Sequence, residues 1–245
     1  MEILFASPHH ASPPSAAAPG DCAACPLARV CRAIRDEDAL PAAPAFRARR
    51  PIRQGEAIYR AGDALQNLYR LRSGSVKVRS TNPSGLEQIT AFPVAGALLG
   101  LDAIETGTHT SDAIALEDSL VCVLPFSELM GNCRQDFTAA QLFNRLIAHD
   151  INECRHLLLA LGCMTAEERM ADFLMGISEQ MAANGYSPRE FVLKMTREDI
   201  ANHLGMKVET VCRVFARLQV AKLVNVRRRR LEIRNIDALR KMSRG

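Results

Sequence analysis

Residues 196–220 read TREDIANHLGMKVETVCRVFARLQV, and this stretch decides the fold of the C-terminal part of the chain. Two short amphipathic patterns meet at Gly205, where glycine tolerates the positive φ that a tight turn needs. Thr196 and Asp199 form an approximate capping box at the start of the first helix, and Ala201 is small where the second helix must come close. The apolar residues follow the spacing of two helices that cross at a turn: Ile200, Leu204, Met206, Val211 and Val214. The stretch predicts a helix-turn-helix, the alternative being a helix pair with a chance glycine.

The second helix of this motif has polar residues suited to the major groove of DNA. Its first turns would enter the groove, and its outward residues are Lys207, Glu209, Thr210, Cys212, Arg213 and Arg217. Glu209 can accept a hydrogen bond from a cytosine amino group, and Arg213 can make a bidentate contact to guanine. Arg217 is expected to contact a phosphate. The alternative for Glu209 is an intrahelical salt bridge to Arg213 at i, i+4.

Charge is distributed unevenly along the 245 residues. The chain carries 31 Lys and Arg and 27 Asp and Glu, a formal net charge of +4. Residues 189–245 hold 15 basic and 6 acidic side chains, whereas residues 1–188 hold 16 and 21. A basic C-terminal module on an acidic body suits a polyanion such as double-stranded DNA. A solvated basic face is the alternative.

The length suggests two domains. No run approaches the ~20 apolar residues of a membrane helix, and the N-terminus lacks a basic segment followed by an apolar core. We therefore expect no membrane partner and a cytoplasmic location. The sequence shows no Ser/His/Asp or Cys/His constellation and no phosphate-binding glycine loop, so we do not expect an enzyme.

Three of the eight cysteines lie close together with C-x2-C-x5-C spacing: Cys22, Cys25 and Cys31. Thiolates select zinc, copper(I) or iron–sulfur clusters. A zinc site and a 4Fe–4S cluster usually take four ligands, so the fourth must come from Cys122, Cys133, Cys154, Cys163 or Cys212. Without a secretion signal, the cysteines favour reduced thiols or a metal site over disulfides. Three unrelated cysteines are the alternative.

The first half of the chain contains segments that differ in composition and in hydrophobic pattern. Residues 1–20 are rich in Ala, Pro and Ser and are expected to form a disordered tail. Residues 36–50 suggest a short helix and a linker. From Pro51, short alternating strands separated by turn signals predict an antiparallel barrel or jelly roll. The alternation is clearest in residues 75–79 and 120–124.

A long helix is predicted over residues 136–161, a span that contains neither Gly nor Pro. A 3-4 spacing joins Asn144, Ile147, Ile151, Cys154, Leu158 and Leu161. Such a seam of nearly three heptads suits a two-stranded coiled coil and hence a homodimer. The polar Asn144 and the small Cys154 make the seam imperfect, which suits a dimer that can come apart. A helix packed only on its own barrel is the alternative.

The C-terminal region completes a winged arrangement around the helix-turn-helix. Residues 165–185 predict a helix that opens with a second capping box, and residues 191–195 predict a short strand. Near the C-terminus, residues 223–226 and 231–234 flank a run of four arginines at 227–230. This pattern predicts a hairpin, or wing, whose arginines hold phosphates rather than read bases.

A β-roll, a long helix and a winged helix-turn-helix, in this order, resemble the CRP/FNR family of bacterial transcription regulators over roughly residues 20–240. The similarity is most specific to the FNR-type oxygen sensors, and Arg213 belongs to it. It is carried by the stretches QNLYRLRSG (66–74), EQIT (87–90), GLDAI (100–104), AEER (166–169), SPREF (187–191) and VET (208–210).

The resemblance implies an α+β fold with an N-terminal, jelly-roll-like β-roll sensor domain, a long dimerisation helix and a C-terminal winged helix-turn-helix. With the tail at residues 1–20, the expected divisions are 21–135 for the cysteine loop and β-roll, 136–163 for the dimerisation helix and 164–245 for the DNA-binding domain. In this arrangement the dimer interface includes Ile147, Ile151, Cys154 and Leu158.

The resemblance also implies the cofactor. In FNR-type sensors an N-terminal cysteine triplet and one β-roll cysteine hold a 4Fe–4S cluster, and the matching residues are Cys22, Cys25, Cys31 and Cys122. Without the resemblance, Cys122 would be read as an ordinary buried strand cysteine. Cyclic nucleotide is not expected, because Leu101 and Thr110 stand where nucleotide-binding members have Glu and Arg. Only Ser111 remains of that phosphate loop.

The recognition helix resembles the FNR type, which binds TTGAT…ATCAA sites, and Glu209 and Arg213 match that pattern. Cys212 departs from the usual serine, and a thiol is a poorer hydrogen-bond partner. Cys154 departs from an acidic residue of the seam. Residues 81–87 match the family's surface for RNA polymerase, although their sequence differs.

The resemblance therefore implies an oxygen-responsive activator of anaerobic gene expression, in which the cluster controls dimerisation and DNA binding. The alternative is a metal or thiol redox sensor on the same scaffold without an iron–sulfur cluster. Metal and sulfide content separate the two.

Overall fold

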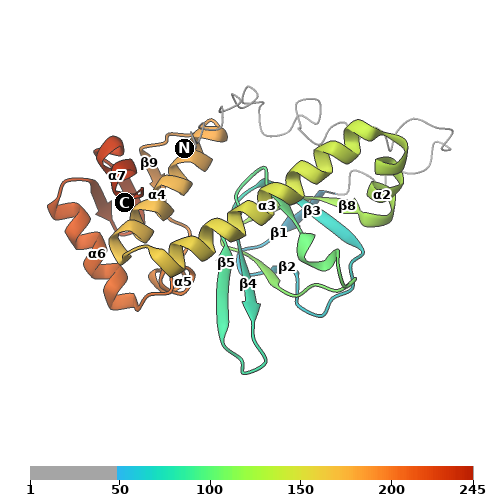
Figure 1. The fold of residues 1–245 in the computed structure, drawn as a ribbon, viewed down its shortest axis with the longest axis horizontal. Coiled ribbons are helices and arrows are strands. Elements are labelled where there is room, and N and C mark those ends of the chain that lie inside the picture. The colour runs from blue at the N-terminus through green and yellow to red at the C-terminus, as the bar shows by residue number, and fades with distance from the viewer. Residues whose placement is uncertain (1–48, 245) are drawn as a thin grey trace, which may run out of the picture.

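The computed structural model describes residues 49–244 and begins with a β-roll of two four-stranded antiparallel sheets (Figure 1). One sheet has the order β1-β8-β3-β6 and the other β2-β7-β4-β5. The strands are β1 (Arg49–Ile52), β2 (Ala57–Tyr59), β3 (Asn67–Ser73), β4 (Val76–Thr81), β5 (Glu87–Ala91), β6 (Leu98–Leu99), β7 (Asp112–Ala115) and β8 (Ser119–Pro125). The predicted jelly-roll-like domain is confirmed, and the strands expected at 75–79 and 120–124 are β4 and β8.

Alternating side chains fill the space between the two sheets. Leu71, Val76 and Val121 are completely buried there, because successive residues of a strand point to opposite faces. The expected tail at residues 1–20, the cysteine triplet and nearly all of the expected linker at 36–50 lie outside the described residues.

Two helices follow the β-roll, α2 (Phe126–Gln135) and α3 (Phe137–Cys163). Asp136 starts the 27-residue α3 by accepting hydrogen bonds from the backbone N–H groups of Thr138 and Ala139. Near its start α3 packs on the β-roll, and it then runs diagonally to the C-terminal domain (Figure 1). Within residues 49–244, no helix has the length and apolar character needed to cross a membrane.

The C-terminal domain is a winged helix-turn-helix, as predicted. Its elements are α4 (Ala166–Ala183), β9 (Glu190–Val192), α5 (Arg197–His203), α6 (Val208–Val220), β10 (Val224–Arg227), β11 (Arg230–Ile233) and α7 (Ile236–Met242), with the sheet order β10-β11-β9. Both predicted capping boxes are present, at Thr165 and at Thr196. The strand expected at 191–195 is shorter and ends at Val192, because the chain must leave the sheet to reach the Thr196 cap.

The turn of the helix-turn-helix has the geometry that its glycine predicts. Gly205 has φ +59°, and a Cβ at this position would lie 3.1 Å from Leu161 Cδ2. The guanidinium of Arg169 in α4 donates to the Leu204 carbonyl at 2.7 Å, which satisfies the end of α5. The apolar residues of the motif are buried as expected, with Met206 partly so.

The β-roll and the helix-turn-helix are joined by hydrogen bonds along β5. Asn202 of α5 accepts from the Ile89 N–H at 2.5 Å and donates to the Glu87 carbonyl at 2.8 Å. Gln88 donates to the Asn202 carbonyl at 2.8 Å. Since β5 is the edge strand of its sheet, α5 occupies the backbone groups that a further strand would otherwise use.

An ion pair and an aromatic cluster extend this interdomain contact. Lys77 of β4 donates to the Asp199 carboxylate at 2.6 Å. Burial opposes the charge of Asp199, but the hydrogen bonds from Lys77 and Thr196 outweigh it and lower the pKa of Asp199. His203 packs against Phe92 and Phe173, with ring centroids 5.0 and 5.7 Å away.

The buried position of His203 predicts a pH-dependent stability. Its ring Nδ1 lies 3.0 Å from the Ile89 carbonyl, and burial lowers its pKa despite this hydrogen bond. In the unfolded chain this histidine has its ordinary pKa of about 6.5 and binds a proton below that pH. In the folded chain it stays neutral to a lower pH. This contribution to stability is therefore present above about pH 6.5 and decreases as the pH falls below it.

Between about pH 7.5 and about pH 5.5, the melting temperature of His203→Asn should fall less than that of wild type. The Asn amide can still donate to the Ile89 carbonyl. Thermal unfolding of both proteins across this range measures it. His149→Asn, at an exposed position of α3, is the control. The same slope in wild type and His203→Asn would show that His203 does not set it.

Candidate nucleic-acid interface

The recognition helix α6 exposes the residues that the sequence assigns to DNA. Lys207 precedes the helix, and its outward side carries Glu209, Thr210, Cys212, Arg213 and Arg217, of which only Thr210 is half-buried. The opposite side is packed into the core through Val211, Val214 and Leu218. One amphipathic helix thus separates the residues that fold the domain from those available to a groove.

The alternative salt bridge between Glu209 and Arg213 does not form. Among the ion pairs of residues 49–244 the two side chains are not paired, and Arg213 Nε instead donates to the Glu209 carbonyl at 3.4 Å. The Glu209 carboxylate therefore stays exposed. This leaves it able to accept a hydrogen bond from a base.

Arg217, expected to contact phosphate, has a carboxylate partner that the sequence did not reveal. Its guanidinium forms an ion pair with Glu167 in the first turn of α4. The two residues are 50 positions apart, so no local pattern indicates the pair. Since Arg217 is 70% exposed, the ion pair is accessible to a competing phosphate.

The structure confirms the predicted hairpin, or wing. Its four arginines occupy two kinds of position, at the strand ends and in the turn. Arg227 and Arg230 face each other at the ends of β10 and β11, and Arg230 also pairs with Glu190 at 3.2 Å. Arg228 and Arg229 form the turn, with Arg228 at φ +58°. The tip therefore carries two of the four arginines.

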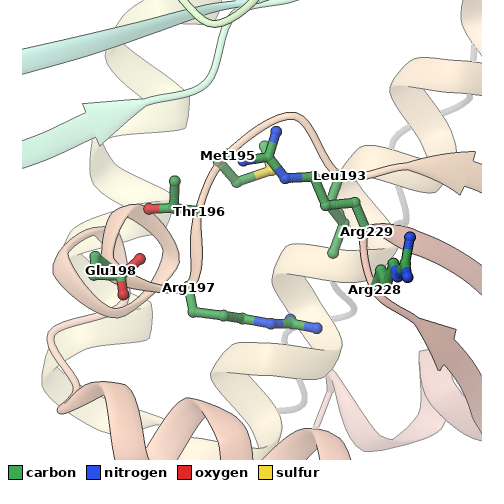
Figure 2. A pocket seen from close by; sticks show the side chains of 7 residues that line it. All are labelled: Leu193, Met195, Thr196, Arg197, Glu198, Arg228 and Arg229. Carbon is green, nitrogen blue, oxygen red and sulfur yellow. The ribbon is translucent and has the colours of Figure 1, made fainter.

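A cationic pocket lies between this tip and the start of α5 (Figure 2). Its volume is about 250 Å³, and it is lined by Leu193, Met195, Thr196, Arg197, Glu198, Arg228 and Arg229. The Arg197 guanidinium stacks on the Phe215 ring at 3.7 Å, and its Nη1 is a buried donor with no partner in the described part of the chain. Figure 2 shows Arg197 extending toward the wing, whereas Glu198 lies on the other side. Arg197 was not evident from the sequence, because its stretch is also explained by helix packing.

The predicted dimer seam lies along an exposed stretch of α3. Ile151 and Leu158 are 45% and 69% exposed, and Cys154 is exposed as well. Ile147 is partly buried against its own β-roll. In this single chain, therefore, the middle of α3 presents apolar side chains to solvent, whereas Ala139 and Phe143 near its start and Ala160 near its end are buried.

Of the predicted metal ligands, the structure describes only Cys122, which is half-buried on β8. Cys22, Cys25 and Cys31 lie outside the described residues. Within residues 49–244 there is no group of three or more His, Cys, Asp or Glu able to hold a metal ion. The other candidate thiols are dispersed over the helices, Cys133 on α2, Cys154 and Cys163 on α3 and Cys212 on α6.

Comparison with known proteins places this arrangement in a family. A Crp-like helix-turn-helix domain model matches residues 168–242, and a cyclic nucleotide-binding domain model matches residues 49–136. The fumarate and nitrate reduction regulatory protein of Salmonella typhimurium is 42% identical over 197 residues, 78% of this chain and 76% of that protein. The protein of the same name from Escherichia coli K12 is 41% identical over 201 residues, 80% and 78% of the two chains. The chain belongs to the CRP/FNR family.

It is therefore a DNA-binding transcription regulator of that family. Its relatives are transcription regulators, which confirms the prediction that it is not an enzyme. The structure of FixK2 from Bradyrhizobium japonicum superposes with a TM-score of 0.72 at 28% identity, covering 80% of this chain and 96% of that one. A CRP-family transcriptional regulator of Thermus thermophilus, with a TM-score of 0.64 and 21% identity over 80% of this chain and 97% of that one, shares the fold.

The Glu167–Arg217 pair predicts a measurable effect on DNA affinity. Glu167→Gln should raise the affinity for duplex DNA of any sequence by up to about fivefold, because it frees Arg217 from an exposed ion pair worth about 0–1 kcal/mol. Arg217→Gln should lower the affinity and reduce the salt dependence by about one phosphate contact. Fluorescence anisotropy of a labelled duplex at several salt concentrations measures both.

The double variant should behave like Arg217→Gln alone. Glu179→Gln, which removes the same charge from an exposed position about three turns further along α4, should leave the affinity unchanged. A loss of affinity in Glu167→Gln would contradict the competition and mean that Glu167 aligns Arg217 for its contact.

Proposed function

We propose that this regulator responds to oxygen and controls anaerobic gene expression. It binds palindromic FNR-type sites as a homodimer and holds a 4Fe–4S cluster through Cys22, Cys25, Cys31 and Cys122. The name and 41–42% identity of the fumarate and nitrate reduction relatives support this proposal. The observation that carries it within this chain is the setting of Cys122.

The neighbours of Cys122 suit an anionic thiolate. Its cross-strand partners are Arg49 of β1 on one side and Arg70 of β3 on the other. Because directly paired residues of neighbouring strands share a face, two arginines start from the face of the sheet that carries the Cys122 thiol. Positive charge nearby favours the thiolate form, which is the form that ligates iron. The residues present therefore fit the proposed cluster.

The described part of the chain also begins at this position. β1 begins at Arg49, directly beside Cys122, and only 17 residues separate Cys31 from Arg49. A chain of this length reaches at most about 60 Å. The three remaining thiolates can thus belong to the same site as Cys122. When bound, such a cluster would link the four thiolates, and oxygen would break this link by converting or destroying the cluster.

The face of the sheet that carries Cys122 is also the face that carries α3. Leu124, two residues along β8, shares this face and packs with Leu68, Ala139 and Phe143. Ligation at Cys122 would therefore stabilise the surface on which α3 begins. The free energy of ligand binding is thereby linked to the position of the dimerisation helix.

A second copy of the chain is the proposed partner of the exposed part of α3. Ile151 and Leu158 occupy one side of the helix at coiled-coil spacing, with Cys154 between them. Partial burial of the sulfur, aided by the carboxylates of Asp150 and Glu153, raises the pKa of the Cys154 thiol. The neutral thiol then packs as a small apolar group. Dimerisation would place two α6 helices about one DNA turn apart.

On DNA, Glu209 and Arg213 are assigned to bases, with Cys212 and Thr210 beside them. Lys207 and Arg217 are assigned to phosphates, together with the pocket between Arg197 and the wing tip. The loop at residues 81–87 is assigned to RNA polymerase. Its Leu86 is 70% exposed, while Asn82 accepts hydrogen bonds from the backbone N–H groups of Ser84 and Leu86. No cyclic nucleotide is assigned, and the chain is proposed to act in the cytoplasm.

Purification without air tests the cofactor. The protein should be brown and contain about four irons and four sulfides per chain, and exposure to air should bleach it while DNA binding falls. Cys122→Ser should lose the visible absorption, whereas Cys133→Ser, at a half-buried thiol of α2, should keep it. A colourless wild-type protein that carries zinc, or no metal, and still binds DNA would favour the alternative metal or thiol sensor.

The dimer is tested by placing a charge on the exposed seam. Ile151→Glu should give a monomer that loses binding to palindromic DNA, because the carboxylate would be buried between two helices. Asn152→Glu adds the same charge on the side of α3 away from the seam and should remain dimeric. Size-exclusion chromatography with light scattering, on iron-loaded protein without air, measures the mass. A dimeric Ile151→Glu would place the interface elsewhere.

A further inference from the structure

One carboxylate in the β-roll collects an unusual number of donors from its own loop. The Asp102 side chain accepts from the Thr110 N–H at 2.8 Å, the Ser111 N–H at 3.1 Å and the Ser111 hydroxyl at 2.9 Å. The Thr110 hydroxyl lies at 3.4 Å, and His109 Nδ1 lies 3.2 Å from the second carboxylate oxygen. Five groups from three consecutive residues thus converge on one anion.

The charge of Asp102 is satisfied without a cationic arginine or lysine. Among the ion pairs of residues 49–244, its only partner is His109. Backbone N–H groups and hydroxyls instead provide the stabilisation, which is the donor set that proteins use to bind phosphate and other small oxyanions. The loop from Gly100 to Ser111 therefore has the chemistry of an anion site.

Two of the three donor residues, His109 and Ser111, are buried in the β-roll. The His109 side chain is 2% exposed and stacks on the Tyr59 ring, with centroids 3.8 Å apart and planes 13° apart. Gly100 has φ +97°, and a Cβ there would lie 3.3 Å from His109 Cε1. Ser111 is only 3% exposed. Packing therefore holds His109 and Ser111 in position, whereas Thr110 is exposed.

The position of the loop in the domain relates this geometry to phosphate binding. It lies inside residues 49–136, which match the cyclic nucleotide-binding domain. Leu101 and Thr110 stand where nucleotide-binding members were expected to have Glu and Arg, but Ser111 is retained, and it donates through both its N–H and its hydroxyl to Asp102. The donors of a phosphate loop are thus present and already engaged.

We propose that the Asp102 carboxylate is the built-in occupant of an anion cradle formed by His109, Thr110 and Ser111. It takes the place of the phosphate that nucleotide-binding relatives receive from solution. The side chain keeps the loop in its anion-filled shape at all times, and its negative charge repels an incoming phosphate. Asp102 is therefore the residue that closes this domain to anionic effectors. Regulation must then enter elsewhere on the β-roll.

Removing the carboxylate should open the cradle to a small oxyanion from solution. Asp102→Ala leaves space for the atoms of formate, whose carboxylate can accept the same hydrogen bonds. The variant should melt several degrees below wild type, and formate should raise its melting temperature in a saturable manner by about 2–4 °C. Chloride at equal ionic strength should not. Wild type should show no formate-specific rise, and Asp102→Ala/Ser111→Ala, which lacks one of the five donors, should show a smaller rise than Asp102→Ala.

Formate shifts of equal size in all three proteins, or no formate-specific shift in Asp102→Ala, would overturn the proposal and leave Asp102 as a loop staple only. If Asp102→Ala does not fold, Asp102→Asn provides the decision. Its amide oxygen can take the place of Oδ2 and accept from the same donors, but it carries no negative charge, so these hydrogen bonds weaken and the melting temperature should fall. Equal melting temperatures for Asp102→Asn and wild type would overturn the proposal. These measurements need neither DNA nor cluster, so they are independent of the proposed oxygen response.

Discussion

The contact between α5 and the edge strand β5 is the constraint on which the rest of the structure depends. An edge strand has unpaired backbone groups, which in most sheets are covered or left to water. Here the side chain of Asn202 supplies an acceptor to Ile89 and a donor to Glu87, as a neighbouring strand would. The first helix of the DNA-binding motif is thereby docked on the β-roll through hydrogen bonds with fixed directions, and not only through apolar packing.

This contact determines how the recognition helix is carried. The Asp199 carboxylate accepts from the Thr196 N–H at the start of α5 and from Lys77 of the β-roll, so one carboxylate belongs to both domains. Apolar residues of the β-roll, including Ile89 and Phe92, belong to the same core as α4, α5 and α6. α3 packs on the β-roll near its start and on the C-terminal domain near its end, so packed elements connect α3 to α6.

Local signals explain which parts could be predicted from the sequence. Thr196, Asp199 and Gly205 lie within ten residues of one another, so their pattern predicted the helix-turn-helix, its cap and its turn. The outward residues of α6 followed from helical periodicity in the same way. The docking of Asn202 on Ile89 joins residues 113 positions apart, and Arg217 meets Glu167 over 50 positions. Asn and Glu are common surface residues, so nothing in the sequence distinguished these two from solvated neighbours.

The cradle around Asp102 shows a different limit. Its donors are close in sequence, and the missing Glu and Arg were visible, yet the sequence indicated only that a phosphate would have too few partners. Whether the remaining groups are empty or occupied depends on the turn after Gly100, which brings the carboxylate back to Thr110 and Ser111. The same loop packs against the start of α3, because Leu101 and Ile104 belong to the apolar cluster that includes Phe143. Asp102 is proposed to keep the loop at residues 100–111 in one state. The face of β8 that carries Cys122 is then the proposed route by which the oxygen signal reaches α3.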